Sequence, residues 1–250
     1  GRVVPLFAAL RAGVGEGASE ASRRLILSVD TFQPSVAEAA IAAGADVVND
    51  TTSLADPDLG RVVAASDAHL VVTHSLAHRH GPRVAVPRPR YGDVVADVRE
   101  HLARTVDTAV SLGVPEERIL VDPGHDLNKT TVHSLELTRR LDEIAALGLP
   151  VLAAVSNKDF IGESLDQHRH ERLAGSLAAA VCCALGGARV LRMHDAAEAV
   201  SAARMVECVL GWRAPARAVH NTGESNPAPD RTTLAEHRAR LVGRAREAGA

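Results

Sequence analysis

The sequence predicts an α/β fold of the TIM (β/α)8-barrel type, and three observations support it. Short apolar, β-branched runs alternate with longer Ala- and Leu-rich stretches, which is typical of βαβ units and a parallel sheet. The runs are apolar throughout, as expected of strands that are buried on both faces. Six successive runs end in polar or charged residues. Because functional side chains of parallel folds gather at the carboxyl ends of strands, this pattern favours a barrel over a doubly wound sheet.

The elements follow in order along the chain. Strands are expected at residues 25–29, 45–48, 69–73, 118–121, 150–155 and 189–193. Helices are expected at residues 3–11, 35–43, 91–112, 134–147 and 167–185. A closed barrel has eight strands, so the first two are expected to be missing from this chain.

Two domains are expected. Residues 1–213 read as the barrel domain, and residues 214–250 as a linker followed by a short C-terminal helix. Residues 221–230 are polar and Pro-rich, and Thr233 and Glu236 after them have the spacing of a capping box.

Composition argues against several classes of protein. No apolar run approaches the roughly 18 to 20 residues of a membrane span, and the N-terminus lacks a signal-peptide layout. The net charge of −3 gives no reason to expect a nucleic-acid partner. We therefore expect a cytoplasmic protein without membrane or nucleic-acid contacts. The three cysteines, Cys182, Cys183 and Cys208, are expected to be reduced, buried thiols.

Lysine usage singles out two positions. Of the 28 basic residues only Lys129 and Lys158 are lysine. In a chain so rich in Arg, a remaining Lys is a candidate for a place where the bulkier guanidinium cannot substitute, although chance survival is the alternative.

Polar groups follow every expected strand. They are Asp30-Thr31, Asn49-Asp50, Thr73-His74-Ser75, Asp122-Pro123-Gly124, Ser156-Asn157-Lys158 and Arg192-Met193-His194-Asp195. Taken singly, an Asp at such a place is equally typical of a helix cap, and Asn49 of a turn. His194 and Asp195 are equally typical of a surface pair. Six such groups in succession indicate one shared site.

Five of these segments resemble the motifs of dihydropteroate synthases, in family order, over Gly1 to about Trp212. They are SVDTF from Ser28, AGADVVNDTTS from Ala43, DPGHDLNK from Asp122, SNKDFIGE from Ser156 and RMHD from Arg192. The resemblance implies a transferase of folate biosynthesis. It joins 6-hydroxymethyl-7,8-dihydropterin pyrophosphate to p-aminobenzoate and releases pyrophosphate.

The resemblance also implies site residues. The pterin would be bound by Asp30, Asn49, Asp122, Lys158 and Arg192, and the diphosphate by Ser156, Arg192 and His194. Lys158, Arg192 and His194 would be the catalytic residues, and none of these would be a metal ligand. The family further implies Mg2+ and a homodimer formed through late helices, here residues 173–187.

Several residues depart from the active-enzyme pattern. His125, Asp126 and Leu127 replace small residues and a Phe in the DPG loop, Asn157 replaces an Arg, and Thr73 precedes His74 where Met is usual. Asp159 adds a negative charge after Lys158. The family's magnesium-binding Asn and its first two loops have no counterpart from Gly1 onward. These departures resemble a divergent second paralogue found beside the working synthase in actinobacteria.

Four functions remain open at this point. They are the synthase, a non-catalytic paralogue that binds a pterin or related ligand, a metal-dependent hydrolase, and a pterin-binding methyltransferase domain. Twelve histidines, among them His78 and His80, motivate the hydrolase. A methyltransferase domain would share the Asp and Asn motifs but would not need Ser-x-Lys or Arg-x-His.

Overall fold

The computed structural model describes residues 3–13, 25–76, 84–218 and 220. These residues belong to two compact units, Gly1–His194 and Asp195–Ala250. The first unit contains the sheet, and the second contains helix α11 (Ala196–Val209). The domain boundary expected at residue 213 stays a prediction, and Thr233 and Glu236 lie outside the described residues.

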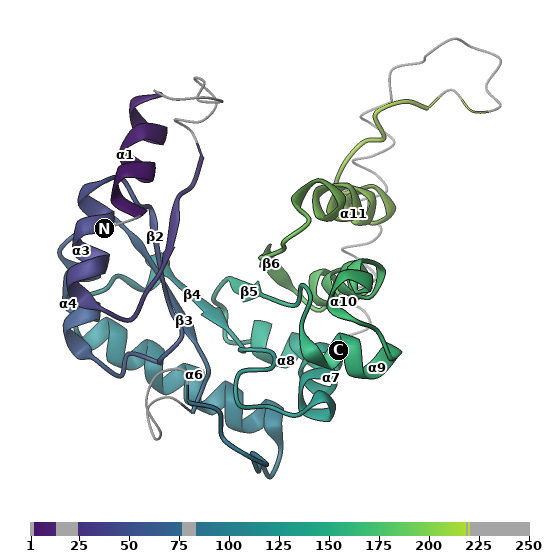
Figure 1. Cartoon of the computed structure of the whole chain (residues 1–250), viewed down its shortest axis with the longest axis horizontal. Coiled ribbons are helices and arrows are strands. Elements are labelled where there is room, and N and C mark those ends of the chain that lie inside the picture. Colours follow the sequence, from purple (N-terminus) through teal and green to yellow (C-terminus); the bar gives the residue numbers. More distant parts are fainter. Residues whose placement is uncertain (1–2, 14–24, 77–83, 219, 221–250) are drawn as a thin grey trace. The chain divides into compact units, whose positions relative to one another are not determined.

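Six parallel strands form one sheet in sequence order, which confirms the predicted alternation. They are β1 (Ser28–Asp30), β2 (Val47–Asp50), β3 (His69–Thr73), β4 (Ile119–Asp122), β5 (Val151–Ala153) and β6 (Ala188–Leu191). Strand order without a reversal is that of a barrel wall rather than a doubly wound sheet. The sheet curls into a half-barrel (Figure 1). Within the described residues, β1 and β6 each pair on one side only.

Helices join the strands of the first unit. They are α1 (Val3–Ala12), α3 (Pro34–Ala42), α4 (Pro57–Ala64), α6 (Val94–Ser111), α7 (Thr131–Arg139), α8 (Leu141–Ala145), α9 (Asp159–Leu165) and α10 (Leu173–Leu185). Two short 3-10 turns, η1 (Glu116–Arg118) and η2 (Arg169–Glu171), precede β4 and α10.

Several helices begin or end at other residues than expected, because a side chain caps the helix or a residue leaves the helical backbone conformation. Helix α6 begins at Val94 rather than residue 91, because the Asp93 carboxylate accepts hydrogen bonds from the Val95 and Ala96 N–H groups. The helix expected at 134–147 is two helices, since Arg140 leaves the helical region at φ −112° and ψ 33°. Asp166 is left-handed at φ 52° and ends α9, so the helix expected from residue 167 starts only at Leu173.

The core lies on both faces of the sheet. Leu70 and Val72 pack into the large apolar cluster between strands and helices. Val71 points to the opposite face, where it joins Leu152 and Ala154 in a small cluster. Successive strand residues alternate between faces, so this small cluster fills the inside of the half-barrel. The strand ends above it are left to polar groups.

The cysteine prediction is correct only in part. Cys183 is buried and all three thiols are free, but Cys182 is exposed and Cys208 is half-buried. Neighbouring helix residues point about 100° apart, and in α10 Cys183 lies on the buried side while Cys182 is turned toward solvent. Over the described part of the chain, no helix has the length and apolar character that crossing a bilayer requires.

Candidate functional site

Asp30 and Asn49 end neighbouring strands and lie side by side. They are partners in the parallel register of β1 and β2, and Asn49 Nδ2 donates a hydrogen bond to Asp30 Oδ2 at 3.2 Å. A carboxylate can only accept, so this bond turns the Asn49 Oδ1 atom the other way. That oxygen is buried, and no described residue forms a hydrogen bond with it. A buried, unpaired acceptor at a strand end is a place where a ligand donor is expected.

Arg192 reaches the same carboxylate from the other edge of the sheet. It follows β6, and its Nη2 lies 3.2 Å from Asp30 Oδ2. The two side chains are 58% and 42% exposed, so the ion pair lies at the open mouth. The curl of the sheet therefore brings together Asp30, Asn49 and Arg192, as the motif pattern predicted.

Asp122 ends β4 and is 5% exposed. Its Oδ1 accepts a hydrogen bond from the Gly124 N–H at 2.7 Å. Burial raises the pKa of this carboxyl, while the Gly124 bond and the positive charges of Lys158, Lys129 and Arg192 oppose the rise. The carboxyl of Asp122 thus lies in the field of Lys158 and Arg192, which the resemblance assigns to the pterin, and of Lys129, which it does not.

Lys129 ties the loops after β3 and β4 together. Its buried Nζ lies 2.8 Å from His74 Nδ1 and donates to the carbonyl oxygens of Gly124 and Leu127 at 2.9 and 3.1 Å. Burial lowers the pKa of Lys129 to about 7. A Cβ on Gly124, whose φ is 68°, would lie 2.1 Å from the His74 oxygen, so only glycine allows this approach.

A cavity of about 430 Å³ joins the ends of β5 and β6. Its lining includes all the side chains that the motifs assign to a diphosphate, namely Ser156, Arg192 and His194, together with Lys158. Ser156 Oγ accepts from the His194 N–H at 3.2 Å, and Lys158 Nζ donates to the His125 oxygen at 3.0 Å. Asp122, Asp30 and Asn49 do not line this cavity.

The same cavity is lined by Arg169, which the sequence analysis did not identify. Arg169 lies on η2, outside every expected strand end, and no periodic pattern marks it. Asn157, at the position where an Arg was expected by resemblance, also lines the cavity, and its backbone is left-handed at φ 56°.

Asp126 joins the DPG loop to the start of α9. Its Oδ2 accepts from the Asp159 and Phe160 N–H groups at 2.6 and 3.3 Å, and its Oδ1 from Ser134 Oγ at 3.0 Å. The first N–H groups of a helix lack partners within the helix, so this carboxylate acts as their cap. Asp126 therefore has a structural function that no local sequence signal indicated.

His125 and Asp159 also have structural partners. His125 is fully buried, stacks on Phe160 at 5.9 Å between ring centroids, and lies 3.2 Å from Thr138 Oγ1 through Nε2. Burial lowers its pKa to about 3, so the ring is neutral. The Asp159 carboxylate is 83% exposed and pairs with Arg172 at 3.0 Å. It does not line the cation-rich cavity.

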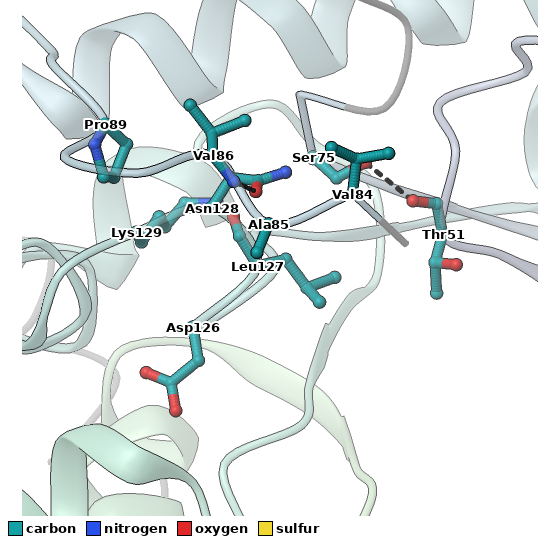
Figure 2. Close-up of a pocket in the computed structure, with 10 residues that line it drawn as sticks. All are labelled: Thr51, Ser75, Val84, Ala85, Val86, Pro89, Asp126, Leu127, Asn128 and Lys129. Carbon is teal, nitrogen blue, oxygen red and sulfur yellow. Dashed lines mark hydrogen bonds between the residues drawn. The ribbon is translucent and has the colours of Figure 1, made fainter. Parts of the chain in front are cut away.

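A second cavity, of about 380 Å³, lies beside the DPG loop (Figure 2). Val84, Val86 and Leu127 give it apolar walls. The Val86 N–H donates to Asn128 Oδ1 at 3.0 Å, which holds this segment against the loop. Figure 2 shows the Asp126 carboxylate directed away from the valines, toward the α9 side of the loop.

Two further predictions concern Asp50 and metals. The Asp50 carboxylate accepts from the Thr52 and Leu54 N–H groups and from Thr52 Oγ1, so it holds the loop after β2. It does not cap a helix, because the N-cap of the following helix α4 is Asp56. Burial raises the pKa of Asp50. Among the described residues, no group of three or more His, Cys, Asp or Glu side chains is placed to hold a metal ion. His78 and His80 lie outside those residues.

Comparison with known proteins gives consistent matches. The sequence profile of the family described as "Pterin binding enzyme" matches residues 2–194. A Mycobacterium leprae protein named "Inactive dihydropteroate synthase 2" is 39% identical over 87% of this chain and 73% of its own length. The Escherichia coli K12 dihydropteroate synthase is 38% identical over 74% of this chain and 64% of its own length. The chain thus spans slightly less than two thirds of the E. coli relative.

A solved structure supports the fold as well as the family. The Xanthomonas albilineans dihydropteroate synthase in complex with 7,8-dihydropteroate superposes with a TM-score of 0.73 and 36% identity, covering 86% of this chain and 76% of that one. The barrel type and the likeness to a second paralogue, both expected from the motifs, are confirmed. The chain belongs to the pterin binding enzyme family, among the dihydropteroate synthases and their paralogues.

Proposed function

We propose that the protein binds 6-hydroxymethyl-7,8-dihydropterin pyrophosphate at the mouth of the half-barrel. The unpaired, buried Oδ1 of Asn49 is the observation that carries this proposal. A dihydropterin presents amino and ring N–H donors beside an oxo acceptor. Asn49, Asp30 and Asp122 supply complementary acceptors and an amide at adjoining strand ends.

The cations fit the other parts of this ligand. Lys158 is assigned to the acceptor atoms of the pterin, and the planar guanidinium of Arg192 to its ring face. Ser156, Arg192 and His194 line the cavity that would take the diphosphate. In the transfer step, a C–N bond forms from the aryl amine, the C–O bond to diphosphate breaks, and the amine loses a proton. Arg192 and His194 would stabilise the charge that grows on the leaving diphosphate.

The cavity beside Leu127 is the candidate site for the aryl ring of p-aminobenzoate, because its walls are largely apolar. With an aryl amine bound there, the protein would act as a dihydropteroate synthase-type transferase.

A second candidate, pterin binding without turnover, is favoured by the charge in that same cavity. Lys129 is the only residue among its described lining that can carry a positive charge as Lys or Arg, and its Nζ already contacts His74 Nδ1 and the carbonyl oxygens of Gly124 and Leu127. Burial also lowers its pKa to about 7. Nothing described there is left to neutralise the carboxylate of p-aminobenzoate. The mycobacterial relatives named as inactive support the same candidate.

Calorimetric titration of the full-length protein with 6-hydroxymethyl-7,8-dihydropterin pyrophosphate tests the proposal. Binding is expected, with loss in Asp122→Ala and Lys158→Ala and about tenfold weakening in Asn49→Ala. Arg104→Ala, on the exposed face of α6, is the control. No binding by the folded wild-type protein would remove both candidates. Turnover with p-aminobenzoate then separates them, because product supports the transferase and binding without product supports the paralogue.

Three further assignments accompany the proposal. The family implies Mg2+, but no group of three or more His, Cys, Asp or Glu side chains among the described residues is placed to hold it.

We propose a homodimer through α10, which exposes Leu173 and Leu185. We place the protein in the cytoplasm, since its three thiols are free and its substrates belong to folate biosynthesis.

A further inference from the structure

We propose that Arg169 is an anion-binding residue of this protein, and that it replaces the Arg missing at position 157. The inference rests on the proposed function and adds a residue that the strand-end motifs do not contain. Arg169 lies 12 positions after Asn157 in the sequence, and both residues line the same cavity.

The charge of the cavity is the first observation. Of its described lining side chains, Lys158, Arg169 and Arg192 carry positive charge and His194 can do so, whereas none is a carboxylate. Arg192 is paired with Asp30, whereas Lys158 and Arg169 have no ion-pair partner among the described residues. An anion bound in the cavity would reduce the repulsion among these cations. Guanidinium groups bind phosphate oxygens through paired N–H donors. The lining therefore suits a phosphate or diphosphate group.

The free charge of Arg169 is the second observation. Within the described part of the chain, Arg169 has no ion-pair partner, whereas nearby Arg172 is engaged by Asp159 and by the carbonyl oxygens of Asn157 and Lys158. The Arg172 guanidinium also packs directly against Gly162, where a Cβ would collide with it. Arg172 is therefore confined by α9 and by the loop before it. Of these two arginines, only Arg169 is left for a ligand.

The backbone that carries Arg169 is held in place. The His168 N–H donates to Glu171 Oε2 at 2.8 Å, and the Glu171 N–H donates to the His168 oxygen at 2.9 Å. The rings of His168 and His170, on either side of Arg169, stack with centroids 6.1 Å apart. The base of the Arg169 side chain is thus fixed beside the cavity.

Asn157 leaves this position without the positive charge of an Arg. Its backbone is left-handed, a conformation that Asn tolerates better than Arg does. The loss of Arg at this position would weaken anion binding unless another side chain supplied the charge. Arg169, on the neighbouring turn, supplies it.

Calorimetry on the full-length protein tests this with two probes, inorganic pyrophosphate and 6-hydroxymethyl-7,8-dihydropterin without its diphosphate. Arg169→Ala is expected to weaken pyrophosphate binding about tenfold or more and to leave dihydropterin binding within twofold. Arg169→Lys should retain part of the affinity, and the pyrophosphate affinity of the wild type should fall more steeply with salt than that of Arg169→Ala. Arg104→Ala, which removes the same charge from α6, should change neither.

The relocation itself is tested by adding Asn157→Arg to Arg169→Ala. Recovery of pyrophosphate binding in the double variant is the expected result. Unchanged pyrophosphate affinity in both Arg169→Ala and Arg169→Gln overturns the inference. If the wild type binds pyrophosphate but not the dihydropterin, the proposed function fails while the anion site stands, so the two failures are distinguishable. Circular dichroism of each variant checks that it is folded.

Discussion

Arg192 and Asp30 form an ion pair across the two edges of the sheet, 3.2 Å apart between Nη2 and Oδ2, although 162 residues separate them. The bond joins the end of β6 to the end of β1, so it lies where the half-barrel is open. The same Asp30 oxygen accepts from Asn49. One carboxylate oxygen thus contacts both the Arg192 guanidinium and the Asn49 amide.

The first prediction is that this pair serves binding more than stability. Its side chains are 58% and 42% exposed, and exposed ion pairs contribute about 0 to 1 kcal/mol. Asp30→Ala and Arg192→Ala should each lower the free energy of unfolding by no more than about 1 kcal/mol. Each should weaken dihydropterin binding about tenfold or more. Arg192→Lys should be intermediate, because it keeps the charge and loses the planar group.

Urea denaturation and calorimetric titration of the same variants check this. A double-mutant cycle over Asp30 and Arg192 should show coupling in the binding energy and little coupling in stability. A stability loss of several kcal/mol with unchanged ligand affinity would assign the pair to the fold instead.

The second prediction concerns Asp126, which caps α9 from the DPG loop. Asp126→Ala removes three hydrogen bonds and should destabilise the protein by about 1 to 3 kcal/mol, combining a lost cap with a lost side-chain bond to Ser134. Asp159→Ala is the matched control. Its carboxylate is 83% exposed, so we expect a change within about 0.5 kcal/mol. Equal stability losses in the two variants, measured by urea denaturation, would contradict the capping function.

The sequence predicted those parts of the fold and site that depend on periodicity. Apolar runs located all six strands, and parallel pairing then places strand ends together, so Asp30 and Asn49 had to be neighbours. The contact from Asp126 to α9 was not predictable in the same way, because Asp126 and Asp159 are 33 positions apart in the sequence and no repeat connects them. Arg169 was missed for a related reason. The sequence predicts a helix over residues 167–185, but Arg169 lies on the short turn η2 before α10, so helical periodicity gives its side chain the wrong setting.

The roles of ionisable residues were not predictable either. The sequence does not reveal burial or ion pairing, so it does not show what His125 and Asp159 do. In the structure the His125 ring is enclosed beside Phe160, and Arg172 engages the Asp159 carboxylate. The negative charge at position 159 is therefore a weaker objection to anion binding than the sequence suggested.

The third prediction is a pH dependence of stability from His125. Burial lowers its folded-state pKa from 6.5 to about 3, so the unfolded chain binds more protons between these values. The contribution of the neutral ring is fully present above pH 6.5 and is lost as the pH falls toward 3. Each pH unit in that window costs at most about 1.4 kcal/mol for one group.

His125→Phe keeps an aromatic ring against Phe160 and cannot be protonated. Its stability should therefore fall less steeply than that of the wild type as the pH decreases through this window. Urea denaturation at a series of pH values gives the difference curve. His170→Phe, at an exposed ring on η2, is the control and should follow the wild type. Parallel curves for wild type and His125→Phe would show that the ring does not stay neutral.

The last prediction concerns Lys129, one of the two lysines in the chain. Lys129 is 8% exposed, and its ammonium lies among His74 Nδ1 and two carbonyl oxygens at 2.8 to 3.1 Å. A guanidinium is larger, so Lys129→Arg should destabilise the protein by about 1 to 3 kcal/mol through overpacking. Lys158→Arg is the comparison, because Lys158 borders an open cavity and the longer group has room there. Its free energy of unfolding should stay within about 1 kcal/mol of the wild type. If both variants are equally stable in urea, the two lysines survived by chance rather than because ammonium is required at position 129.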